Sequence, residues 1–168
     1  MSNQNIPVVR QTNWISVIPQ LIFMALLILI FHLLKVNDPI IWSFLTYIIL
    51  SIGSRKIIAK DHNKGIKLTK EQKFNDAIKH FEQSAEFFKK NNWIDKYRFL
   101  TLFSASKMSY REMALNNIAF CYSQIGNGVK SKEYYEKTLA EYPNSILAKT
   151  GLNMINSAQN IQNNNTGV

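Results

Sequence analysis

The first third of the chain contains two long runs of hydrophobic positions, separated by a short polar stretch. Residues 15–34 contain no aspartate, glutamate, lysine or arginine, and the second run stays uncharged up to Arg55. Because an α-helix rises about 1.5 Å per residue, the first run can cross the roughly 30 Å hydrocarbon core of a bilayer. The second run is shorter, but Arg55 and Lys56 can extend their charged ends outward. We therefore predict a transmembrane helical hairpin with spans at about residues 15–34 and 39–58.

Two other interpretations of these runs predict a different protein. A secretory signal peptide would be followed by a cleavage motif of small residues, which is not seen here, and would need no second apolar run. Buried core helices of a soluble domain would need polar parts of the chain to cover them. The charged side chains of residues 1–59 are Arg10, Lys35, Asp38, Arg55 and Lys56. So few charges favour a membrane hairpin.

The charges that flank the runs predict the orientation of the hairpin, because lysine and arginine are enriched on cytoplasmic flanks. Lys35 and Asp38 cancel at the tip, whereas a basic stripe follows the second span. The basic stripe consists of Arg55, Lys56, Lys60, Lys64, Lys67 and Lys70. We expect an integral protein of a bacterial inner membrane with both termini in the cytoplasm.

The basic stripe also predicts that the second helix continues out of the membrane to about Lys70. At 100° per residue, its lysines fall within about a third of the helix circumference. Such a stripe is attracted to the anionic headgroups of the bilayer. The alternative is a site for an acidic peptide or a phosphate group.

Behind the hairpin, hydrophobic residues recur every three or four positions, which is typical of helices that bury one face. These stripes cover residues 74–88, 115–122 and 134–142. Gly126 and Asn127 end the second stripe, and Pro143 stops the third. The pattern predicts pairs of helices joined by short turns, with an insert at residues 92–111 between the first pair and the second.

Residues 115–145 resemble the tetratricopeptide-repeat family, whose repeat is an antiparallel helix pair of about 34 residues. The residues that carry the resemblance are Ile118, Ala119, Tyr122, Gly126, Asn127, Ser131, Tyr135, Thr138 and Pro143. A weaker copy has Gly65, Leu68, Phe74, Ala77, Phe81 and Ser84 at the same offsets. It departs from the family pattern at Gln72, where a turn glycine is usual, and it has no proline after Phe88.

The predicted fold class is therefore all-α, with a transmembrane hairpin followed by a small repeat domain. The hairpin occupies residues 1–59 and the repeat domain residues 60–158. The expected repeats are at about residues 58–91 and 112–145, and a closing helix covers about residues 146–157. Residues 159–168 are polar and low in complexity, which predicts a disordered tail.

The resemblance implies that peptides or proteins bind to the concave face formed by the first helix of each pair. The matching positions are Asn63, Ile66, Lys70, Asn116, Phe120 and Gln124. Amide side chains can hydrogen-bond an extended backbone, an aromatic side chain can line an apolar pocket, and a lysine can provide a point charge. We call these six positions the predicted groove.

Composition and charge add little chemistry to this picture. The chain of 168 residues has 20 lysines and arginines against 11 acids, which gives a net charge of +9. Without a recognised motif or interleaved aromatics, this excess does not indicate nucleic-acid binding. The single Cys121 excludes a disulfide framework and a cysteine-rich metal site. No histidine pair has metal-binding spacing, and no glycine-rich phosphate loop is present. We expect no enzyme activity, no cofactor and no metal.

The sequence thus predicts a membrane-anchored interaction scaffold that presents a repeat surface to a protein or peptide at the cytoplasmic face. The alternative is a structural or assembly subunit of an integral membrane complex, in which the spans make the contacts.

Overall fold

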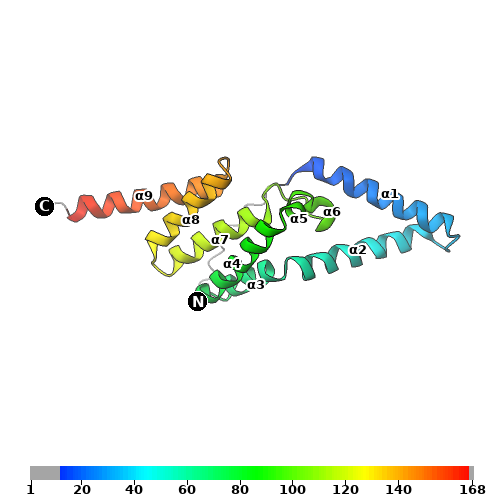
Figure 1. Ribbon diagram of the computed structural model, residues 1–168, viewed down its shortest axis with the longest axis horizontal. Helices are drawn as coiled ribbons and strands as arrows, with labels where there is room; N and C mark the ends of the chain where they lie inside the picture. The colour runs from blue at the N-terminus through cyan, green and yellow to red at the C-terminus, as the bar shows by residue number, and fades with distance from the viewer. Residues whose placement is uncertain (1–11, 167–168) are drawn as a thin grey trace.

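The computed structural model describes residues 12–166, and the regular secondary structure in this range is helical, as predicted. Figure 1 shows a V-shaped hairpin of two long helices at one end of the molecule and a stack of packed helices at the other. The hairpin consists of the short 3-10 helix η1 (Trp14–Val17), α1 (Ile18–Leu33) and α2 (Pro39–Ile58). The stack consists of α3 (Lys60–Lys70), α4 (Phe74–Lys90), α7 (Tyr110–Gln124), α8 (Gly128–Glu141) and α9 (Ile146–Thr166).

The hydrophobic side chains of the hairpin helices are exposed or half-buried. In α1 no residue is buried, and in α2 only Ser43 is. The helical stretches Trp14–Leu33, which joins η1 and α1, and Pro39–Ile58 are each long and apolar enough to cross a membrane. A proline stands in the first turn of each helix, where its missing N–H costs nothing. Lys35 and Asp38, both with positive φ, form the tight connection between the helices. The structure therefore contains the two apolar helices that the sequence predicts.

The prediction that the second apolar helix continues unbroken to about Lys70 is wrong. The helix ends at Ala59, which has φ −98° and ψ 27°, and a new helix begins at Lys60. Ala59 is buried in a cluster with Phe88 and Leu102, so the chain bends where it meets the core. The carbonyl of Arg55 accepts from the N–H of Ala59 at 3.2 Å and also from the side chain of Asn63 at 3.0 Å.

In the stack, each helix packs on the next, and α7 lies between α4 and α8. The largest buried cluster joins α3, α4 and α7 and contains Leu68, Ala77, Ile78, Phe81, Ala85, Ala114, Leu115, Ile118 and Cys121. Gln72 turns the chain between α3 and α4 with φ 59°, at the position where a glycine is expected. Gly65 allows α3 to lie close to α4, because a Cβ atom there would be 2.7 Å from the ring of Phe81.

Two segments differ from a simple series of helix pairs. The insert contains the short helices α5 (Asn92–Lys96) and α6 (Arg98–Thr101), followed by irregular chain up to Ser109. The last helix, α9, extends to Thr166, so the prediction of a disordered tail is wrong for residues 159–166. These residues contain no proline or glycine, and a helix already nucleated by packing gains one hydrogen bond for each residue added.

Candidate functional site

A hollow in the stack, of about 260 Å³, lies between α4 and α8. Its floor is apolar and buried, and is formed by Ala85, Leu115 and Ile118. Its rim carries charges of both signs together with one aromatic side chain. The rim residues are Glu82, Glu86, Lys89, Tyr134 and Lys137. We call this feature the α4–α8 hollow.

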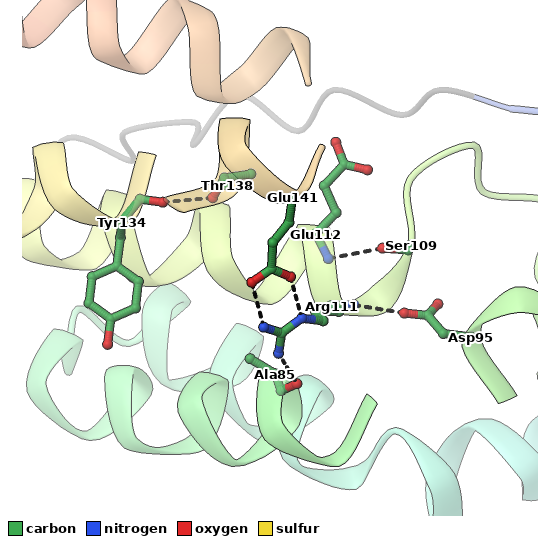
Figure 2. A network of polar contacts seen from close by, with 8 residues as sticks. All are labelled: Ala85, Asp95, Ser109, Arg111, Glu112, Tyr134, Thr138 and Glu141. Atoms are coloured by element: carbon green, nitrogen blue, oxygen red, sulfur yellow. Dashed lines mark hydrogen bonds and ion pairs between the residues drawn. The ribbon is translucent and has the colours of Figure 1, made fainter. Parts of the chain in front are cut away.

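A buried arginine, Arg111, also lines the hollow, and Figure 2 shows its polar contacts. Arg111 donates from Nε and Nη2 to the two carboxylate oxygens of Glu141, each at 2.6 Å. Its third nitrogen donates to the carbonyl of Ala85, also at 2.6 Å. The hydrogen bonds from Arg111 lower the pKa of Glu141, so this carboxylate stays ionised. A bidentate pair of this kind is strong and has a fixed geometry, so Arg111 holds α4, α7 and α8 together.

Arg111 is positioned by a second carboxylate, which comes from the insert. Asp95 lies in α5 and is buried. Its oxygens accept from the backbone N–H groups of Tyr110 and Arg111 at 2.8 and 3.0 Å. A carboxylate at this place satisfies N–H groups that have no partner inside the helix, and it interacts favourably with the helix dipole. Ser109 caps the same helix by accepting from the N–H of Glu112.

Tyr134, which also lines the hollow, links α8 to α4. Its hydroxyl donates to Glu82 at 3.0 Å. Burial, with the nearby carboxylate of Glu82, raises the pKa of Tyr134, so the phenol remains protonated and able to donate. The ring of Tyr134 stacks on Tyr122, and the ammonium of Lys137 lies 5.4 Å from its centroid. The rim is therefore organised by contacts within the protein, but Lys137 and Glu86 remain exposed.

Two side chains of the stack with potential reactivity, Cys121 and His62, are buried. Burial raises the pKa of Cys121 to about 11, so its thiol is protonated. His62 is buried between the rings of Phe81 and Tyr110, and desolvation lowers its pKa from 6.5 to about 4. Among residues 12–166, no three side chains of the types that bind metals lie close enough together to hold an ion.

The structure distributes the predicted groove over different environments. Lys70 and Gln124 are exposed, as is Asn63, whose amide caps α2. Ile66 and Phe120 are half-buried at the edge of the largest core cluster. Asn116 is only 5% exposed and donates to the carbonyl of Glu112, so it does not line an open surface. The prediction that Asn116 lines the groove is therefore wrong, because the α7 face that carries Asn116 packs toward Ser145.

The basic stripe also changes at its first member. Arg55 donates from Nε to the carbonyl of Leu102 at 2.9 Å and from Nη2 to that of Phe103. Its guanidinium therefore contacts the backbone of the insert, although the residue as a whole is exposed. The other members of the stripe are exposed too, and Lys67 approaches Glu71 at 3.9 Å. Because α3 is a separate helix that leads away from the hairpin (Figure 1), Lys70 lies about 15 Å further along its axis than Lys60. This distance of about 15 Å is longer than the roughly 8–10 Å over which salt screens a charge. The lysines of the basic stripe therefore do not all lie equally close to the hairpin.

The predicted site residues do not include those that organise the hollow, above all Arg111, Glu141 and Tyr134. For the pair of Arg111 and Glu141, the sequence does contain a signal. Arg111 lies in the first turn of one helix of an antiparallel pair, and Glu141 ends the other. Residues at these two ends must lie close together when a short turn joins the helices. No such rule relates Tyr134 to Glu82, which is 52 positions away.

Comparison with known proteins adds no relatives to this description. The chain matches no family model, and no curated protein or solved structure is significantly similar to it.

Proposed function

We propose that this protein is a membrane-anchored interaction scaffold, in which a two-span hairpin holds a repeat domain of the tetratricopeptide type at the cytoplasmic face. The observation that carries the proposal is the contrast between two joined regions. The hairpin exposes its apolar side chains, whereas the stack buries them and exposes charge. No flexible linker separates the two, because Ala59 alone lies between α2 and α3.

The α4–α8 hollow is the surface that we propose for the partner. An apolar floor with a rim of mixed charge suits a short peptide segment that inserts one apolar side chain and pairs charges on both sides. Lys137 and Lys89 can bind carboxylates of that segment, and Glu86 can bind a basic residue. This surface differs from the predicted groove, which lies on the first helix of each pair.

The alternative function is that of a subunit in an integral membrane complex. The exposed faces of α1 and α2 support it, because partner spans as well as lipid can cover them. In that case the hairpin makes the specific contacts, and the stack is a structural cap.

Affinity purification of full-length variants in mild detergent separates the two functions. Lys137→Glu reverses a charge on the rim of the hollow, and Tyr134→Ala removes its aromatic side chain. Lys149→Glu is the matched control, because Lys149 is an exposed lysine of α9 outside the hollow. A partner that is lost with both rim variants and kept with the control supports the scaffold.

Loss of partners only when the hairpin is exchanged for unrelated spans supports the subunit function instead. Partners that persist in all the rim variants, and also after exchange of the hairpin, would contradict both functions.

A further inference from the structure

The insert lies at the open end of the membrane hairpin, where the first helix begins and the second ends (Figure 1). Helix α6 contacts α1. The chain that follows α6 pairs with the start of the hairpin: Thr12 and Ser106 form an isolated β-bridge, and the N–H of Asn13 donates to the carbonyl of Ala105 at 2.8 Å. Residues 92–108, which we call the wedge, are therefore held between the two arms of the V.

The irregular part of the wedge has its backbone carbonyls bound by two arginines. Arg55, in the last turn of α2, donates to the carbonyls of Leu102 and Phe103. Arg98 donates to the carbonyls of Asp95, Ser106 and Lys107 at 2.9, 3.0 and 2.8 Å. Irregular backbone is tolerated at membrane depth only where protein groups satisfy its polar atoms. The two arginines meet that requirement for the carbonyls that they bind.

One side chain of the wedge reaches between the two apolar helices. Phe103 is buried, and its ring centroid lies 5.5 Å from that of Phe23 in α1 and 5.1 Å from that of Tyr47 in α2. Both partners lie near the middle of their helices. Phe103 thus fills the space that the V leaves open, and it connects the wedge to the part of the hairpin that we propose to be in lipid.

The wedge also carries exposed apolar and aromatic side chains. Trp93 is 60% exposed, Tyr97 46% and Leu100 42%. They belong to α5, to the single residue between the two short helices and to α6, in that order. The ammonium of Lys96 lies 5.6 Å from the ring centroid of Tyr97. Tryptophan and tyrosine beside basic side chains are the composition that settles at the boundary between headgroups and acyl chains.

The geometry points to a third membrane contact: the wedge inserts Trp93, Tyr97 and Leu100 into the interface of the cytoplasmic leaflet, around the open end of the hairpin. The occupant of these exposed apolar side chains is lipid, because α6 contacts α1 at the open end of the hairpin and the exposed Lys96 beside Tyr97 suits anionic headgroups. The inference rests on the proposed membrane anchoring and adds that the repeat domain is fixed to the bilayer by its insert as well as by its spans.

Tryptophan fluorescence of the full-length protein in phosphatidylglycerol-containing vesicles tests this inference. The chain has three tryptophans, so Trp14→Phe combined with Trp42→Phe leaves Trp93 as the only reporter. A second variant with Trp14→Phe and Trp93→Phe leaves Trp42 as a reporter of the hairpin. A third lacks all three and carries Val129→Trp, at an exposed position of α8 on the stack. Lipids brominated near the headgroup and the soluble quencher acrylamide are compared in each variant.

We expect brominated lipid to lower the emission of Trp93 about twofold or more, because indole settles in the interface. Acrylamide should quench Trp93 much less than the tryptophan at position 129, which lipid should leave unchanged. Quenching of Trp42 but not Trp93 by brominated lipid would overturn the inference and leave the hairpin in place. Shielding of Trp93 from both quenchers would overturn it too, because protein and not lipid would then cover the wedge. If neither Trp42 nor Trp93 responds to lipid, the proposed anchoring itself is wrong.

Discussion

The hairpin and the stack are both helical, but the hairpin exposes its hydrophobic side chains whereas the stack buries them. Leu26 and Ile49 point outward from α1 and α2, whereas Phe81 and Leu115 are buried among the helices of the stack. Helix formation alone therefore does not determine the environment in which a segment is stable. The pattern of hydrophobic positions determines it, because uninterrupted apolar runs need an apolar solvent and stripes at helical spacing need partner helices. A mutation should therefore have different effects in the two regions.

The largest expected effect comes from removing a core aromatic of the stack. Phe81→Ala should lower the free energy of unfolding of the stack by about 3–5 kcal/mol, since it removes a fully buried ring and leaves a cavity. Leu26→Ala is the control in the hairpin, because Leu26 is half exposed and touches no part of the core. Thermal unfolding in mild detergent, followed by circular dichroism, measures both. Equal losses for the two variants would contradict the division into two regions.

Breaking the arginine–glutamate pair should have the next largest effect. Glu141→Leu leaves the buried Arg111 without its bidentate partner, at a cost of about 3 kcal/mol. Glu136→Leu makes the same change at an exposed position of α8 and should be nearly neutral. The same melting experiment compares them. If Glu141→Leu were as stable as Glu136→Leu, Arg111 would not hold α4, α7 and α8 together.

Acid should destabilise the stack through His62. The pKa of His62 is lowered to about 4 in the folded protein, below its ordinary value of 6.5. Above pH 6.5 both states are neutral at this residue. As pH falls from 6.5 to 4 the unfolded chain binds a proton that the folded chain does not, so stability decreases by up to about 3 kcal/mol. Below 4 this contribution stays constant.

His62→Leu should remove this part of the pH dependence, which unfolding by denaturant at a series of pH values would reveal. His80→Leu is the control, because His80 is half exposed and has a partner in Asp61 at 3.1 Å. An unchanged slope between pH 6.5 and 4 in the His62 variant would show that the histidine is not enclosed as described.

A small-to-large change at the contact of three helices should have the smallest of these effects. Ala119 is fully buried against Tyr135 and Ala148, so Ala119→Trp should cost about 1–3 kcal/mol by overpacking. Val129→Trp adds a similar ring at an exposed position and should leave the melting temperature unchanged. If the two variants melt alike, α7, α8 and α9 do not meet at Ala119.

The sequence predicted the helical class and the two apolar helices, because these depend on residue patterns within one segment. It also placed turns near Gly126 and Gln72, where the structure has positive φ. The break at Ala59 was missed, because it depends on burial of Ala59 against Phe88, which lies far along the chain. The predicted end of the last helix was wrong for a local reason, since polar composition by itself does not stop a helix.

Less of the candidate site than of the fold could be predicted from the sequence. The predicted groove followed from a family resemblance, which sets positions along a helix but does not determine which of them neighbouring segments cover. Asn116 shows this, because the turn at Ser145 covers it. Arg55 shows the same for the basic stripe, because its guanidinium donates to the irregular backbone of the wedge. Contacts between distant segments, such as Tyr134 with Glu82, carry no signal in one sequence.

The central claim is that the apolar hairpin lies in lipid and the stack lies in water. Extraction of washed membranes with alkaline carbonate tests it most directly, because carbonate releases proteins that are held by surface contacts but not those whose helices cross the bilayer. We expect the full-length protein to sediment with the membranes after carbonate and to enter the supernatant only with detergent. Release of the full-length protein by carbonate alone would contradict it.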